Sequence, residues 1–205
     1  MDKKDFLFSI ADTQQGFFTA RQAVKCGYFR ANFHRYITAG EWIKELRGIY
    51  RLAYYPVTSH PELVMWILWS QNKQGESQGV WSHETALEIY ELSDVMPAKN
   101  HMTVPKKFRK WTATPKSLVI HFADLPSSEI ITQQGYMITT PLRTIFDIVE
   151  EGVLAEDLIV QAIREALQKG LFSRKQLNEF TKYKRGIPDA FKIVATIYAH
   201  IQDET

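Results

Sequence analysis

Four polar side chains fall on one side of a predicted helix over residues 29–39, and their chemistry suits contact with the edges of DNA bases. Arg30 and Arg35 are fixed cations of the kind that forms paired hydrogen bonds with guanine, and His34 donates or accepts one. Thr38 is small enough to allow close approach. The opposite side of this helix repeats bulky residues at helical spacing, and we expect that side to lie in a core: Phe29, Phe33, Tyr36 and Ile37.

A shorter helix over residues 20–25 is predicted to precede this one. Thr19 is a suitable N-cap, because its hydroxyl accepts from a free backbone amide in the first turn, and Gly27 supplies the positive φ that ends the helix. Two further cations, Arg21 and Lys25, lie on it. We expect both to contact phosphates at the edge of the groove that the second helix enters.

Two β-rich runs, 42–46 and 49–52, flank the dipeptide Arg47-Gly48 and predict a hairpin. Two helices followed by a hairpin with a basic tip describe a winged helix-turn-helix. In such folds the second helix lies in the major groove and the wing follows the phosphate backbone or the minor groove. Arg47 and Arg51 are the predicted wing contacts.

The positive charge of the chain is concentrated in this first part. Residues 1–55 hold nine Lys or Arg against five Asp or Glu, a net charge of +4, whereas all 205 residues together carry only +2. A local excess of this kind is what a phosphate-binding face requires. Two alternatives stay open: a small packing module with a solvated cationic face, and a docking domain for proteins, a role that winged helices also have.

Pro56 limits the backbone of Tyr55 and removes a hydrogen-bond donor, so we place a domain boundary there. The predicted domains are a winged helix-turn-helix over 1–55 and a mixed, mostly helical domain with a small sheet over 56–205, which makes the fold class α+β. We expect a nearly all-apolar helix over 63–71 at the centre of the second domain. Further predicted helices start near residues 3, 82, 141, 155, 173 and 188, and predicted strands cover 99–104, 118–122 and 136–138.

One helix start in the second domain is especially clear. Thr140 is a suitable N-cap, and Pro141 fits the first helical position, where a missing amide proton costs nothing. Arg143 and Asp147 follow at i and i+4, the spacing of an exposed or half-buried ion pair worth a few tenths of a kcal/mol.

Several segments follow one another in a characteristic order and spacing: Gly16–Ala20, Gly27, His34-Arg35, Gly40, Arg47–Leu52, Ala86–Tyr90, Met102–Pro105 and Thr139–Asp147. In these segments the chain resembles the AbiEi family, the antitoxins of type IV toxin-antitoxin systems associated with abortive phage infection. The resemblance implies a cytoplasmic repressor of its own operon that binds double-stranded promoter DNA, with inverted repeats as the expected target. It also implies pairing with a nucleotidyltransferase-like toxin that the second domain opposes.

Enzyme signatures are missing from the sequence. The six histidines are scattered without a metal-binding spacing, and we find no Gly-rich phosphate loop and no acid pair of a nucleotidyltransferase. We therefore predict no catalytic residues, no metal and no cofactor. The single Cys26 is consistent with a reducing cytosol, and we expect neither a signal peptide nor a membrane span.

A second basic segment lies between Asp94 and Asp124, where no acidic residue occurs. Its central cations are Lys106, Lys107, Arg109 and Lys110, interleaved with Phe108 and Trp111. Aromatic rings between cations are typical of surfaces that follow a nucleic-acid backbone. The segment is either a solvated loop or a second surface for nucleic acid or for an acidic partner.

Overall fold

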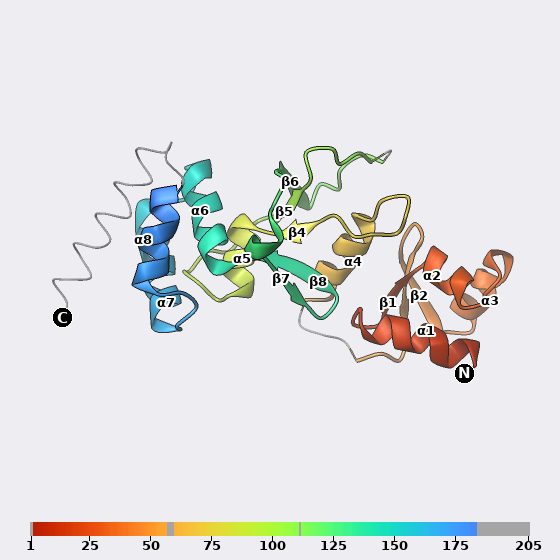
Figure 1. Cartoon of the computed structure of the whole chain (residues 1–205). Coiled ribbons are helices and arrows are strands. Elements are labelled where there is room, and N and C mark those ends of the chain that lie inside the picture. Colours follow the sequence, from red (N-terminus) through yellow and green to blue (C-terminus); the bar gives the residue numbers. More distant parts are fainter. Residues whose placement is uncertain (1, 57–59, 111, 184–205) are drawn as a thin grey trace. The chain divides into compact units, whose positions relative to one another are not determined.

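The computed structural model describes residues 2–56, 60–110 and 112–183 (Figure 1). The chain forms two compact units, one of Met1–Val80 with Thr132–Met137 and one of Trp81–Ile131 with Ile138–Thr205. The predicted functional division at residue 55 stays a prediction. The predicted helix over 188–201 lies outside the described residues. Among the described residues, no helix combines the length and the apolar character that crossing a bilayer requires.

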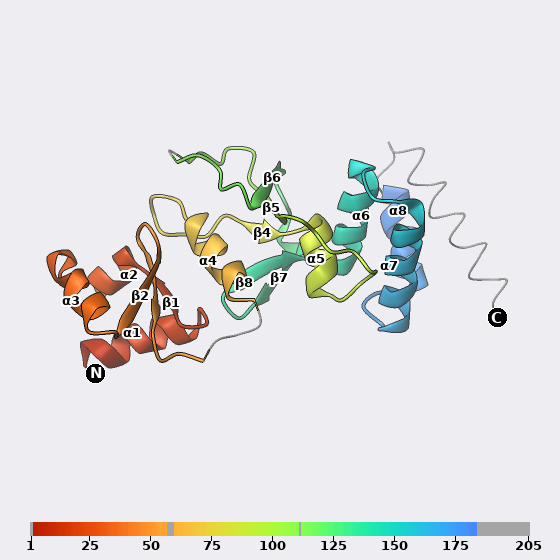
Figure 2. The same cartoon turned by 180° about the vertical axis from the view of Figure 1, so that it is seen from behind.

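The first unit begins with a winged helix-turn-helix, as predicted. Its elements are α1 (Lys3–Asp12), β1 (Phe17–Thr19), α2 (Ala20–Lys25), the 3-10 turn η1 (Arg30–Asn32), α3 (Phe33–Thr38), β2 (Trp42–Leu46) and β3 (Ile49–Leu52). The three strands form an antiparallel sheet in the order β1-β3-β2, so the chain returns from the β2–β3 hairpin to pair with β1. Figures 1 and 2 show α1, α2 and α3 beside this sheet.

Side-chain caps begin the first two helices. Asp2 and Asp5 form a capping box at α1, and Thr19 and Gln22 form another at α2. Each box satisfies backbone amides that the first turn of a helix leaves without a partner. Gly27, with a φ of 90°, then turns the chain toward α3.

Trp42 is the centre of the aromatic core of the winged helix. Its ring lies 4.7 to 5.1 Å, centroid to centroid, from Phe18, Tyr28, Phe33 and Tyr36, which come from β1, the turn after α2, and α3. Offset and edge-on ring pairs at this spacing add to the free energy gained by burying their area. This single side chain therefore joins the helices to the sheet.

Two sequence predictions in this unit are wrong. Phe29 is 76% exposed, because the α-helix starts only at Phe33 and Phe29 precedes the 3-10 turn in an extended conformation. The apolar helix α4 (Pro61–Trp69) belongs to the first unit and not to the centre of the second. It packs on the winged-helix sheet, where its Val64 and Leu68 contact Phe17 and Ile49.

The second unit contains most of a five-stranded sheet and the remaining helices. From residue 80 onward the elements are β4 (Val80–Trp81), α5 (His83–Ile89), β5 (Asn100–Val104), β6 (Leu118–Phe122), η2 (Ser127–Glu129), β7 (Ile130–Gln133), β8 (Tyr136–Thr139), α6 (Pro141–Glu151), α7 (Glu156–Gln168) and α8 (Arg174–Tyr183). Of these, Val80 and the Thr132–Met137 part of β7 and β8 belong to the first unit. The strand order is β6-β5-β4-β8-β7, and β5 and β6 run parallel. Both views show α6, α7 and α8 side by side (Figures 1 and 2). The fold class is α+β.

Helix α6 begins as predicted but carries a buried charge cluster. Thr140 accepts from the amide of Arg143, and Pro141 occupies the first turn. Arg143 is only 8% exposed, and its guanidinium donates to Asp147 at 2.6 Å and also to Glu129. The predicted ion pair is thus real, but it is buried and has a third member from η2.

Candidate nucleic-acid interface

The surface of α2, η1 and α3 carries the cations that the sequence predicted for DNA contact. Every predicted side chain of these three elements is exposed: Arg21, Lys25, Arg30, His34, Arg35 and Thr38. The structure shows no ion pair for any of these cations among the described residues, and the core beneath them is uncharged. Their positive charge is therefore directed to solvent.

His34 has a defined orientation on this surface. Its Nδ1 lies 2.9 Å from the carbonyl oxygen of Ala31, so Nδ1 carries the proton and donates it. In the neutral ring this leaves Nε2 as a hydrogen-bond acceptor. An acceptor at this position suits the exocyclic amino groups of adenine or cytosine in the major groove.

The hairpin tip and the hairpin strand place their arginines differently. Arg47 is exposed at the tight turn, where Gly48 adopts a φ of 82°. Arg51 lies on β3, donates to Glu45 at 2.8 Å and has a side chain that is 17% exposed. Its guanidinium also lies 5.9 Å from the ring centroid of Phe17. A phosphate would have to compete with Glu45 for Arg51, whereas Arg47 is available.

Phe29 is a candidate that the sequence placed in the core. Its ring lies on the surface directly before Arg30, at the start of the 3-10 turn that leads into α3. An exposed phenyl ring at this point suits an apolar contact with a thymine methyl group. The sequence carries no clear signal for this, because neither the 3-10 turn nor α3 begins with a side-chain cap.

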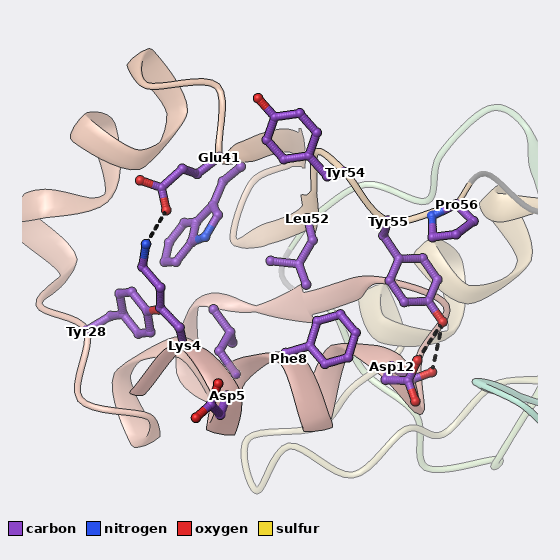
Figure 3. A pocket seen from close by; sticks show the side chains of 12 residues that line it. Lys4, Asp5, Phe8, Asp12, Tyr28, Glu41, Leu52, Tyr54, Tyr55 and Pro56 are labelled. Atoms are coloured by element: carbon purple, nitrogen blue, oxygen red, sulfur yellow. Dashed lines mark hydrogen bonds and ion pairs between the residues drawn. The ribbon is translucent and has the colours of Figure 1, made fainter. Parts of the chain in front are cut away.

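A groove of about 920 Å³ lies on another part of the winged helix, between α1 and the chain that leaves β3 (Figure 3). Its lining is largely aromatic and aliphatic, with Phe8, Leu52 and Tyr55 among the side chains drawn. Tyr55 donates to Asp12 Oδ1 at 2.9 Å, and Lys4 pairs with Glu41 at 3.4 Å. With three acidic residues and one lysine in its lining, this groove does not suit a nucleic-acid backbone.

The second basic segment forms the connection between β5 and β6. Lys106, Lys107 and Arg109 are exposed, and Lys110 is partly buried, which lowers the pKa of its amine. Phe108 is only 6% exposed, so the prediction of this ring as a stacking platform is wrong. Trp111 lies outside the described residues. Lys106, Lys107 and Arg109 thus form an exposed basic surface. Its binding to nucleic acid or to an acidic partner stays a prediction.

Three of the six histidines come together in the second unit, which the sequence did not reveal. The ring centroids of His83 and His121 are 3.6 Å apart, and His101 Nδ1 lies 3.1 Å from His121 Nε2. Burial lowers the pKa of His83 to about 3 and that of His121 to about 4, so both rings are neutral near pH 7. Although far apart in sequence, His101 and His121 meet because β5 and β6 pair in parallel register, and His83 joins them from the start of α5.

Comparison with known proteins supports the same assignment of the first unit. Residues 5–53 match a family model described as transcriptional regulator, AbiEi antitoxin, which confirms the resemblance over this segment. The crystal structure of the RV2827C protein from Mycobacterium tuberculosis is similar in fold, with a TM-score of 0.55 and 11% identity over 95% of this chain and 75% of that one. A comparison with curated proteins gives no match.

Proposed function

We propose, from the match of residues 5–53 to the AbiEi antitoxin regulators, that this chain represses its own operon and is the antitoxin of a type IV toxin-antitoxin system. The observation that supports this most is the exposed cationic surface of α2, η1 and α3 on a winged helix-turn-helix. Its target is double-stranded promoter DNA in the cytoplasm, with inverted repeats as the expected sequence. Its opponent is a nucleotidyltransferase-like toxin.

In this proposal α3 enters the major groove. Arg30 and Arg35 form paired hydrogen bonds with guanines, and His34 accepts from an amino group through Nε2. Thr38 contacts a base edge or a methyl group. Phe29 adds an apolar contact beside Arg30.

Phosphate contacts hold the helix in register on the duplex. Arg21 and Lys25 bind phosphates at the edge of the major groove, and Arg47 at the hairpin tip binds the backbone or the minor groove. Arg51 joins the wing contact only if phosphate displaces Glu45 from its guanidinium. Each phosphate contact releases counterions, so affinity depends on salt.

Titration against the chain's own upstream DNA and against a scrambled duplex, at two salt concentrations, tests this proposal. We expect a clear preference for the upstream sequence and a log-log salt slope of about −0.9 for each phosphate contact. Equal affinity for both duplexes at both salt concentrations would sink the repressor assignment.

The groove of Figure 3 favours a second candidate function, in which the winged helix docks a protein and the chain is a non-enzymatic interaction module. Aromatic side chains with an acidic rim suit a basic, apolar segment of a partner. Under this alternative, DNA affinity at physiological salt would not exceed the non-specific range of roughly 10⁻⁴ to 10⁻⁶ M. The same titration therefore separates the two candidates.

A further inference from the structure

The three clustered histidines lie beside two carboxylates at the junction of α5, α6 and the sheet. His83 starts α5, His101 and His121 lie on one face of the paired strands β5 and β6, and Glu151 ends α6. Each of His83, His121 and Glu151 offers a ligand atom within 4.8 Å of the other two. Glu84 lies 3.7 Å from His101 Nε2.

Hydrogen bonds to neighbouring side chains position the His83 ring and the backbone of His101. The Ser82 hydroxyl lies 2.9 Å from His83 Nδ1 and accepts from Thr103 Oγ1 at 2.7 Å. Thr85 accepts from the backbone amide of His101 at 2.7 Å, which ties α5 to β5. Such outer contacts are what orients the ligands of metal sites in proteins.

The contacts of the cluster allow a proton arrangement that leaves two ring nitrogens free to bind an ion; in the other tautomer of His83, Ser82 donates to Nδ1. His101 donates through Nε2 toward Glu84 and accepts at Nδ1 from His121 Nε2, while His83 donates from Nδ1 to Ser82. This leaves a lone pair on His83 Nε2 and another on His121 Nδ1. Within the described residues, neither atom has a hydrogen-bond partner. Neutral imidazole nitrogens with a free lone pair are the form that binds metals.

We propose that His83, His121 and Glu151 bind one divalent transition-metal ion of the zinc class. Two histidines and one carboxylate are a donor set that zinc accepts, and a water or a neighbouring side chain supplies the remaining position. The chain from Glu84 through His101 to His121 is then an outer carboxylate-histidine partner. The exposed carboxylate of Glu151 gives the ion a route from solvent.

Binding requires one local movement. The His83 and His121 rings are stacked with an angle of 11° between their planes, whereas an ion lies near the plane of each imidazole that holds it. One ring must tilt. His121 has the room to do so, because it is only partly buried and β6 is the edge strand of the sheet.

The test is calorimetric titration of the untagged full-length chain with Zn²⁺ after treatment with a chelator. We expect one ion per chain, and His121→Ala and Glu151→Gln should each weaken binding by at least the roughly 10- to 100-fold known for loss of outer contacts. His60→Ala is the matched control, since this histidine is exposed and lies in the other unit. It should bind as the unchanged chain does.

Circular dichroism with chelator present shows whether each variant is folded. If His121→Ala fails to fold, Glu151→Gln decides the question, because Glu151 is exposed and makes no hydrogen bond within the described residues. Visible absorption of a Co²⁺-loaded sample reports the coordination directly, and Glu151→Gln should change it. The proposal is overturned if the unchanged chain binds no stoichiometric Zn²⁺, or if Glu151→Gln binds it equally well.

Discussion

The winged-helix domain, α1 to β3, keeps its cations out of its core, whereas the second unit buries an arginine together with a carboxylate. The core around Trp42 contains no charged residue, and Arg30 and Arg35 point to solvent above it. In the second unit Arg143 and Asp147 are buried together, near three clustered histidines. Arginine is therefore exposed to solvent in one unit and part of the internal structure in the other.

This difference predicts which substitutions change folding and which change only binding. Where the core is uncharged, a surface arginine is removed at little cost in stability. Where an arginine neutralises buried carboxylates, its removal leaves them without compensation. Replacing single residues of each kind tests this comparison.

The largest effect is expected for Trp42→Ala. Loss of this ring removes contacts with both helices and with the sheet, and such core truncations cost about 3–5 kcal/mol of unfolding free energy. Denaturant unfolding followed by circular dichroism measures the change, and DNA binding should be lost with the fold. Phe29→Ala is the control, because this ring is exposed and should leave stability unchanged. A stable Trp42→Ala variant would show that the aromatic core does not hold the helices.

Arg143→Ala should be nearly as destabilising, by about 3–5 kcal/mol, because it breaks a buried ion cluster. Burial lowers the pKa of the guanidinium, but Asp147 and Glu129 raise it more, so the charge is kept. Arg143→Met combined with Glu129→Gln and Asp147→Asn should recover part of the loss, since no buried carboxylate then remains. If the combined variant loses as much unfolding free energy as Arg143→Ala, the stabilisation comes from packing and not from charge.

The sequence predicted those elements whose start or extent is set by neighbouring residues alone. Thr19 caps α2 and Thr140 with Pro141 begins α6 as expected, and β6 has the predicted bounds, 118–122. The strands β1, β4 and β7 were not predicted. The first two are three and two residues long and fully buried, so they show no alternation of apolar and polar residues, and β7 is half polar.

The candidate site could be predicted only in part, for a related reason. The cations opposite the apolar side of α3 were expected on the surface, and the structure exposes Arg30, His34 and Arg35. Contacts between residues that only tertiary structure brings together leave no pattern in the sequence. The pairing of Arg51 with Glu45 depends on the hairpin, and the histidine cluster depends on the register of β5 and β6.

Arg35→Ala should separate binding from folding. We expect unchanged unfolding, a loss of about 1–3 kcal/mol in binding to the operator, and reduced discrimination between operator and random duplex. Lys25→Ala should instead weaken both duplexes alike and make the salt slope shallower by about 1. Competition titrations with both duplexes measure these values. Equal weakening of both duplexes by Arg35→Ala would contradict its base-reading role.

Acidification should destabilise the metal-free second unit. The pKa of His83 is lowered from 6.5 to about 3 and that of His121 to about 4, mainly by burial, so between these values and pH 6.5 the unfolded chain binds more protons than the folded one. Stability is therefore present above pH 6.5 and falls as the pH drops toward 3–4, by up to about 1.4 kcal/mol per pH unit for each histidine. Thermal unfolding with chelator between pH 7 and 4 shows the slope, and His121→Asn should reduce it. A flat profile would mean that these rings take up protons with the same pKa in the folded and the unfolded chain.

The smallest effect is expected in the basic segment between β5 and β6, where the second unit exposes several cations close together in sequence. Lys106 and Lys107 are both exposed, so replacing both with Ala should change unfolding free energy by less than about 0.5 kcal/mol. If the segment is a solvated loop, the salt slope of operator binding also stays the same, whereas a second DNA contact would lower it by about 1 for each lysine. We expect no change, because Phe108, one of the two rings predicted to stack on bases, is buried. A lower slope would show that the second unit also presents a phosphate-binding surface and would end the contrast between the units.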